Sequence, residues 1–176
     1  MKHFYLVSSL PSLALGEPVP FSVEDFRFKC MGVLTVPELE ELDLVLAGRM
    51  SEGESPFSRQ WFSIDAQMRN AVARVRATRL GIDSKNFLKD HPGYSMQVEK
   101  SVTDAFAKAT PLDRELELDH CRWVLLDDLT LQDAFGFIAV MAFAVKLQIA
   151  ERWAALKDDV GRKRVETLAA QVKSQG

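Results

Sequence analysis

The residues that come closest to a catalytic pattern lie in an acidic stretch, Glu117-Leu118-Asp119-His120. On a helix, the three-residue spacing puts the Glu117 carboxylate and the His120 imidazole on one face, as in the di-iron sites of helical bundles. Such a site needs a second motif of this kind and two further glutamates, and a chain with three histidines contains no second motif. We interpret His120 as an ordinary histidine of an acidic helix. We expect no metal, no cofactor and no catalytic residue.

The two cysteines offer little further chemistry. Cys30 and Cys121 are far apart in sequence and form no CxxC motif, so we expect reduced, buried thiols rather than a disulfide or a zinc site. His120 precedes Cys121, but neighbours on a helix point about 100° apart and do not face each other. A pairing of Cys30 with a histidine in space stays open. The phosphate-binding, dinucleotide-binding, serine-hydrolase and zinc-protease motifs are absent.

Charge is divided between two segments that read as long helices. Five arginines and one aspartate lie in 57–81, whereas 111–128 contains six acidic residues and two arginines. Opposite charge favours antiparallel pairing of the two helices, in which arginine forks meet carboxylates at the edge of an apolar seam. Because exposed pairs add only about 0–1 kcal/mol each, they would mainly set register. The residues assigned to this structural pairing are Arg69, Arg76, Arg79, Glu115, Asp119 and Arg122.

A nucleic-acid interface is the other interpretation of the arginines. The formal net charge of −3 supplies no overall attraction for a polyanion. Stacking aromatics, which single-strand binders use, are missing between Phe62 and Phe87. We therefore expect no nucleic-acid partner.

Helix signals occupy most of the chain and predict an all-α fold of about six to eight helices. Ser22 with Asp25, and Thr35 with Glu38, have the spacing of helix-starting caps. Thr110-Pro111 and Thr130 with Asp133 indicate further starts, and Gly81 is a natural helix end. We leave open one short strand at Phe4–Ser8. The expected helices cover 22–31, 35–48, 57–80, 95–108, 111–128, 130–156 and 160–176, with a loop at 49–56 and turns at 91–93 and 158–161.

Length and composition are those of one globular domain over 1–176. A subdivision into an N-terminal segment 1–50, a long-helix core 57–156 and a C-terminal helix 160–176 stays open. The uncharged run 134–145 is about 12 residues long, short of the roughly 20 that a membrane-spanning helix needs. The first residues resemble a signal peptide, but Ser8, Ser9 and Pro11 interrupt the apolar stretch. We expect a cytoplasmic protein.

Aromatic residues on the last long helix could line a ligand cavity or belong to the core. The residues concerned are Phe135, Phe137, Phe143 and Trp153. A stripe of aromatics at helical spacing is typical of core packing, so we favour the core.

Several short segments together resemble one bacterial family. They are Tyr5–Pro11 with Leu13, Gly16 and Pro20–Ser22; Met68–Asn70, Arg74–Ala77 and Arg79–Gly81; Pro111-Leu112, Glu115, Leu118-Asp119 and Arg122-Trp123; and Lys146–Ile149 with Glu151–Trp153. They resemble an uncharacterised family encoded beside V-type ATPase subunits, whose members are similar to the C subunit of that rotary complex (subunit d in eukaryotes).

The resemblance implies an all-helical, non-catalytic subunit without a cofactor. The C subunit sits on the membrane rotor ring and receives the foot of the central stalk, so it couples ATP turnover to ion transport. The implied partners are these stalk and ring subunits, and the implied membrane contact is only through the complex. The C subunit has three helical lobes, of which 176 residues can form one or two. The alternative is a free-standing helical regulatory or ligand-binding protein unrelated to the ATPase.

Overall fold

The structure, a computed structural model, describes residues 3–173, with side chains described for residues 3–156. Seven α-helices and two short 3₁₀ helices make up this part of the chain, and it contains no strand. In chain order the elements are α1 (Phe4–Ser9), α2 (Val23–Met31), α3 (Val36–Leu46), η1 (Met50–Glu52), α4 (Pro56–Leu80), η2 (Lys85–Phe87), α5 (Met96–Ala107), α6 (Pro111–Thr130) and α7 (Phe137–Lys173). The expected all-α, multi-helical fold is confirmed.

Side-chain caps fix where most of these helices begin. The Ser22–Asp25 and Thr35–Glu38 pairs form capping boxes at α2 and α3, as their spacing predicts. Ser55, Ser95 and Thr110 accept hydrogen bonds from the backbone of the first turns of α4, α5 and α6. These caps satisfy N–H groups that a helix start leaves without a partner.

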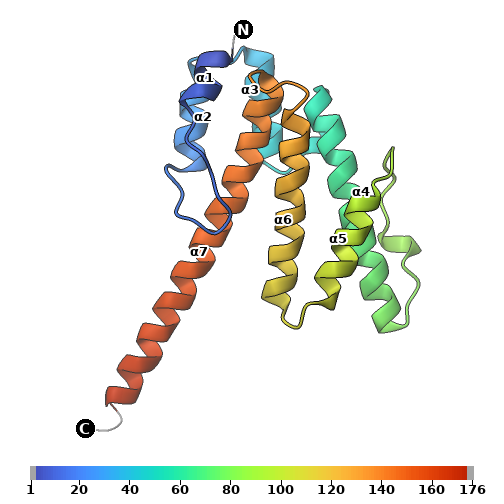
Figure 1. The fold of residues 1–176 in the computed structure, drawn as a ribbon, viewed down its shortest axis with the longest axis vertical. Coiled ribbons are helices and arrows are strands. Elements are labelled where there is room, and N and C mark those ends of the chain that lie inside the picture. The colour runs from blue at the N-terminus through green and yellow to red at the C-terminus, as the bar shows by residue number, and fades with distance from the viewer. Residues whose placement is uncertain (1–2, 174–176) are drawn as a thin grey trace.

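The first half of α7 is the centre of the molecule. It contacts α1, α2, α3, α4 and α6, and it buries apolar side chains at helical spacing, including Val140, Met141, Ala144 and Leu147. On its other side α4, α5 and α6 form a second group, in which α5 packs against both neighbours and α6 runs opposite to α4 (Figure 1). Beyond this body, the later turns of α7 extend away from the other helices (Figure 1). The two groups of helices therefore share one core, with the first half of α7 between them.

Two expectations for the chain are wrong, and the strand left open at its start does not form. Phe4–Ser8 is not a strand but belongs to α1, because an isolated strand leaves its backbone groups unpaired, whereas a helix pairs them within the segment. The helix expected to start at Thr130 starts at Phe137 instead, since α6 continues to Thr130 and a turn follows. The expected turn at 158–161 does not form, because α7 continues to Lys173. Gly161 costs a helix only about 1 kcal/mol relative to alanine, too little to end it.

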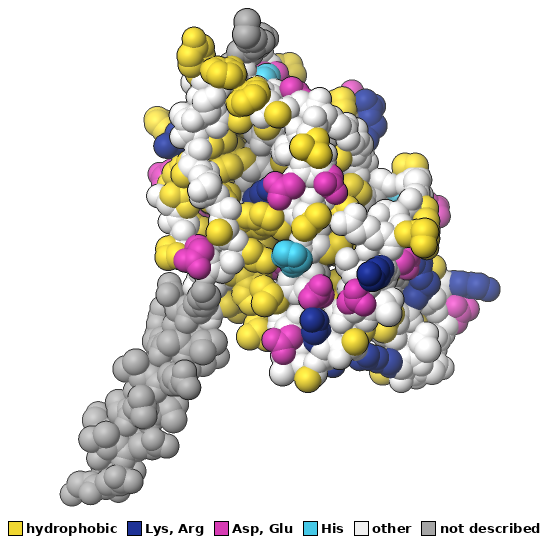
Figure 2. Space-filling model, in the orientation of Figure 1, with side chains coloured by type: hydrophobic (Ala, Val, Ile, Leu, Met, Phe, Trp, Pro, Cys, Tyr) yellow, Lys and Arg dark blue, Asp and Glu magenta, His cyan; other side chains and the backbone are white. Residues whose placement is uncertain are grey.

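Hydrophobic side chains on the viewed face of Figure 2 gather where the N-terminal segment meets α7 and α6. The N-terminal segment contributes partly buried apolar side chains that pack against the core, including Val7, Leu13, Leu15 and Val19. Along the described residues, no helix combines the length and the hydropathy that crossing a bilayer requires.

Candidate functional site

A buried carboxylate, Asp119, ties α6 to α7. It is completely inaccessible to solvent, and its Oδ2 accepts a hydrogen bond from the Trp153 indole nitrogen at 2.7 Å. Arg122 donates to Oδ1 at 2.8 Å, and Arg152 donates to Oδ2. A buried carboxylate is tolerated only when its charge and its acceptor positions are both satisfied, and here both are. The Asp119 cluster, meaning Asp119, Arg122, Arg152 and Trp153, is therefore a fixed internal joint.

The expected pairing between the arginine-rich helix and the acidic helix takes a different form. Asp119 and Arg122 do meet, but on the same helix. Among the described residues, the ion pair that joins α4 to α6 has the reverse polarity, since Arg122 of the acidic helix lies 3.7 Å from Asp65 of the basic helix. Arg69 pairs with Asp65 one turn before it, at 2.6 Å.

The other arginines of α4 have different partners. Arg79 donates to the Phe106 carbonyl of α5, and Arg74 binds Glu99 of α5 at 2.7 Å. Neither Arg76 nor Glu115 has an ion-pair partner among the described side chains. The direct charge pairing therefore fails because α5 packs against both helices and takes up the contacts that α4 was expected to give to α6.

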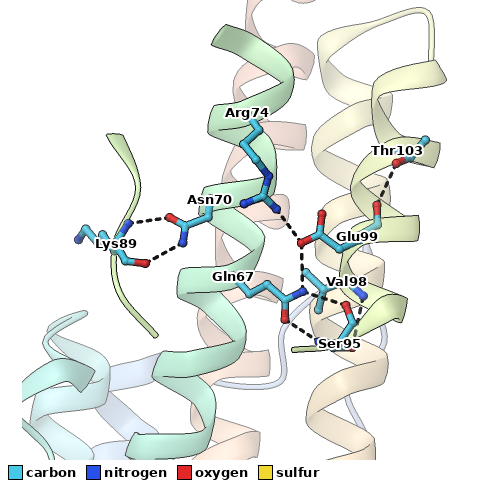
Figure 3. A network of polar contacts seen from close by, with 8 residues as sticks. All are labelled: Gln67, Asn70, Arg74, Lys89, Ser95, Val98, Glu99 and Thr103. Carbon is cyan, nitrogen blue, oxygen red and sulfur yellow. Dashed lines mark hydrogen bonds and ion pairs between the residues drawn. The ribbon is translucent and has the colours of Figure 1, made fainter. Parts of the chain in front are cut away.

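Two side-chain amides on α4 hold the segment that leads into α5 (Figure 3). The Asn70 amide donates to the Lys89 carbonyl at 2.7 Å and accepts from the Lys89 N–H at 2.9 Å. One turn earlier, Gln67 accepts from the Ser95 N–H at 2.8 Å and donates to the Ser95 carbonyl and to Glu99. Both amides are buried, so each satisfies backbone groups that water cannot reach. This amide clamp fixes the 81–95 connection against α4.

Sequence reasoning missed the amide clamp. Gln67 and Asn70 are three residues apart on a helix whose neighbouring positions carry charge, and alone they look like solvent-facing residues. A usable signal was the loop that follows the helix, which contains Pro92 and Gly93. A loop of that kind has free backbone groups that an amide can satisfy.

An open groove of about 510 Å³ lies between the second half of α4 and the first half of α6. Its apolar surface is formed by Val72, Ala73 and Ala77 of α4 and Leu118 of α6, and by Leu80, Ile82 and Phe87 at one edge. The three edge residues are half or more exposed. Because the amide clamp fixes the 81–95 connection, Ile82 and Phe87 are held as a wall of the groove. We call this feature the α4–α6 groove.

Charged side chains border the α4–α6 groove unequally. Arg69, Arg76 and Arg122 line it, against the single carboxylate of Glu115. Arg69 and Arg122 also line a smaller cavity, to which α7 contributes Val145, Gln148, Ile149 and Arg152. α7 therefore lies over α4 and α6 beside Arg69 and Arg122, and the α4–α6 groove begins where α7 no longer covers the two helices.

The residues first considered for chemistry have ordinary surroundings. Glu117 pairs with Lys108 at 3.2 Å, and His120 borders a shallow depression with Leu15. Burial raises the pKa of the Cys30 thiol to about 12 and also raises that of Cys121. Thiols in such positions are poor nucleophiles. Over the described residues, no three His, Cys, Asp or Glu side chains gather as a metal ion would need.

The aromatic residues of the last long helix belong mainly to the core. The Phe143 ring contacts Phe21 and Phe26, and Trp153 is buried in the Asp119 cluster. Phe137 is partly buried beside His3. Phe135 is half exposed and touches Phe4. No common cavity joins these four rings among the described pockets.

Comparison with known proteins gives one family. Residues 42–175 match a family described as a protein of unknown function (DUF2764). No curated protein and no solved structure matches the chain. The match spans α4 to α7, and so includes the Asp119 cluster, the amide clamp and the α4–α6 groove.

Proposed function

The chain belongs to the DUF2764 family of proteins of unknown function, and from this starting point we propose that it is a non-catalytic peripheral subunit of a V-type rotary ATPase. In this role it links the central stalk to the membrane rotor ring, as its sequence resemblance to the C (d) subunit implies. It is then a cytoplasmic protein that meets the membrane only through the complex.

One observation carries the proposal. The segments that resemble the C-subunit-like family contain many of the residues that lock the helices to one another, although Gln67 of the amide clamp lies just outside them. Beside the Asp119 cluster and the amide clamp, Gln148 donates to the Leu46 carbonyl at 2.8 Å and Glu151 accepts from the Val23 N–H at 2.8 Å. The resembling residues with such contacts are Asn70, Arg74, Asp119, Arg122, Gln148, Glu151, Arg152 and Trp153. The resemblance therefore includes residues that hold the helices in fixed positions relative to one another, which we call the mechanical framework.

A framework of this kind suits a part that transmits torque. Torque passes through a part without loss only when its elements keep their relative positions under load. Buried, satisfied polar contacts resist such sliding, because breaking one leaves a desolvated group without its partner. The joint at α6–α7 is buried, and those at α4–α5, α2–α7 and α3–α7 are partly buried, so together they connect both halves of the molecule.

Coupling measurements in native membranes test the proposal. Membranes from cells that lack the protein should hydrolyse ATP but lose ATP-driven ion uptake, because the head is no longer joined to the ring. Supplying the chain from a plasmid should restore uptake. Affinity purification of the full chain from mildly solubilised membranes should recover stalk and ring subunits together. Normal ion uptake without the protein, or recovery of neither subunit, would reject the proposal.

The α4–α6 groove favours a second candidate, a free-standing helical ligand-binding protein. Its volume and its mixed apolar and charged lining are in the range of small-molecule sites. A thermal-shift screen of the purified chain with nucleotides, lipids and metal ions separates the candidates. A rise of several degrees with one compound, abolished by Ala73→Trp in the groove, would favour this second function.

A further inference from the structure

The α4–α6 groove has the shape of an unfilled helix position. Along α4 and α6, one stretch is covered by residues of α7, and the groove is the stretch that continues from it. The α4 residues that line it run from Arg69 to Leu80, which is about 16 Å of helix or three turns. A helix laid between two others is the usual way in which such an apolar seam is covered.

We propose that the α4–α6 groove binds an amphipathic helical segment of a partner protein, about three turns long, that carries carboxylates along one edge. Its apolar side chains, at spacing i, i+3 or i+4, and i+7, rest on Val72, Ala73, Ala77 and Leu118. Its carboxylates meet Arg76. This inference stands on the groove and does not need the ATPase assignment.

Charge selects an acidic occupant. Arg76 is exposed on the groove border and has no ion-pair partner among the described side chains. The neighbouring Arg79 is also exposed and donates to a backbone carbonyl, which leaves its charge without a carboxylate. Of the three arginines that line the groove, Arg69 and Arg122 already pair with Asp65 and Asp119, so the positive charge left for a partner is that of Arg76 and the neighbouring Arg79, against the carboxylate of Glu115. A partner carboxylate can form a bidentate contact with Arg76 and is steered there by this local field.

Two other occupants fit less well. Residues 157–176 of a second copy contain five Lys or Arg and three Asp or Glu, so their net charge has the same sign as the arginine border. A membrane surface is flat on this scale, whereas the floor of the groove lies between two helices and is reached only by an inserted side chain. Anionic lipid could neutralise Arg76 but would not reach Ala73 between the two helices.

Photo-cross-linking from the edge of the groove tests the proposal in the cells that make this protein. Leu80, 72 % exposed, is replaced by p-benzoylphenylalanine in the full chain, and the residues joined to it after irradiation are read by mass spectrometry. The expected product is a segment of another protein with the stated apolar spacing and a net negative charge. The same replacement at Leu131, 81 % exposed and distant from the groove lining, should not yield it.

A charge reversal then asks whether Arg76 selects the segment. Arg76→Glu should lower the yield of the cross-link at least fivefold, and Arg76→Lys should restore most of it. Arg59→Glu makes the same charge change on the same helix outside the groove and should leave the yield unchanged. Circular dichroism melts check that each variant is folded. Cross-links only to lipid, to a second copy or to basic or non-amphipathic segments would overturn the proposal. So would no yield above the Leu131 control, or equal yields from the Arg59 and Arg76 reversals.

Discussion

Replacing Asp119 by asparagine should be among the most damaging conservative changes in this protein. Asp119 and asparagine have the same shape, so the change removes charge and one acceptor without opening a cavity. The new NH₂ group must point either at the Arg122 guanidinium or at the donors from Trp153 and Arg152. In both orientations donor faces donor inside a site that no solvent reaches.

The size of the effect follows from the burial of each partner. Hydrogen bonds to a charged group contribute about 1.5–3 kcal/mol each, and a buried donor left without an acceptor costs about 1–3 kcal/mol. Trp153 is buried and the Arg122 side chain is only 19 % exposed, so both contribute, whereas the Arg152 side chain is 52 % exposed and adds little. We therefore expect Asp119→Asn to lower the free energy of unfolding by roughly 3–5 kcal/mol, the range for breaking a buried charge pair.

Urea unfolding followed by circular dichroism at equal protein concentration measures this loss. The matched control is Asp128→Asn, an exposed position of the same helix, for which we expect a change within about 0.5 kcal/mol. A cycle with Trp153→Phe, which removes the indole N–H, should give a coupling free energy of about 1 kcal/mol or more. A loss below about 1 kcal/mol for Asp119→Asn, or strict additivity with Trp153→Phe, would refute the argument that this cluster is a joint.

Four further changes test other parts of the structure. Asn70→Ala should release the clamped connection, so that trypsin cuts after Lys85 and Lys89 at least tenfold faster than in the exposed-site control Asn86→Ala. Gly53→Ala should lower the free energy of unfolding in urea by about 1–3 kcal/mol, because a Cβ there would lie 2.6 Å from Ser58 and 2.7 Å from the Glu41 carboxylate. The control is Gly32→Ala, which should change the free energy of unfolding little, because a Cβ there meets no atom closer than 3.8 Å. Partial burial alone would raise the pKa of Glu41, but hydrogen bonds from Ser58, Glu54 and Ser55 hold it below the ordinary 4.5. The stability that the ionised Glu41 contributes is therefore present above about pH 4.5 and should be lost as the pH falls further. An equally steep loss of stability with falling pH in Glu41→Gln would contradict this. With its pKa at about 12 instead of 9.0, the Cys30 thiol has a roughly thousandfold smaller thiolate population at pH 8. Iodoacetamide should therefore modify Cys30 only after the protein unfolds. Rapid labelling of the native chain would show that Cys30 is not buried.

The helix starts could be predicted because each depends on residues close in sequence. Ser22 with Asp25 and Thr35 with Glu38 form their caps within one turn, whatever the rest of the chain does. Gly81 ends α4 for an equally local reason, since it adopts the left-handed conformation, with φ of 68°, that glycine accepts readily. Such helix ends can therefore be predicted from a few adjacent residues.

The turn between α6 and α7 shows where local reasoning fails. Thr130 and Asp133 have the spacing of a cap, yet Thr130 is the last residue of α6 and Asp133 lies in the turn after it. A Cβ on residue 136 would overlap the Asp133 carboxylate, so a larger residue there would push that exposed side chain aside. Thr130 can either begin a new helix or end α6. The packing of α6 against α7, which involves residues distant in sequence, decides between the two.

The candidate site was harder to predict than the fold. Counting charge on two segments identified the residues around the groove, including Arg69, Arg76 and Arg122. It could not show that α5 packs against both helices, and so it assigned to α6 contacts that Arg74 and Arg79 make with α5. Charge has long reach and low directional preference, so sequence indicates that such helices attract but not which pairs form.

The central position of α7 has a consequence for synthesis on the ribosome. α4, α5 and α6 contact their neighbours in sequence and can assemble as they emerge, whereas α1, α2 and α3 pack mainly on α7, and the bond from Val23 to Glu151 closes a loop of 128 residues. Until α7 leaves the exit tunnel, the face of α1, α2 and α3 that packs on α7 stays exposed, with core residues such as Phe26, Leu42 and Val45 only partly covered. At about 5–20 residues per second, that interval lasts roughly 5–25 s. During it the nascent N-terminal region is a natural client for chaperones.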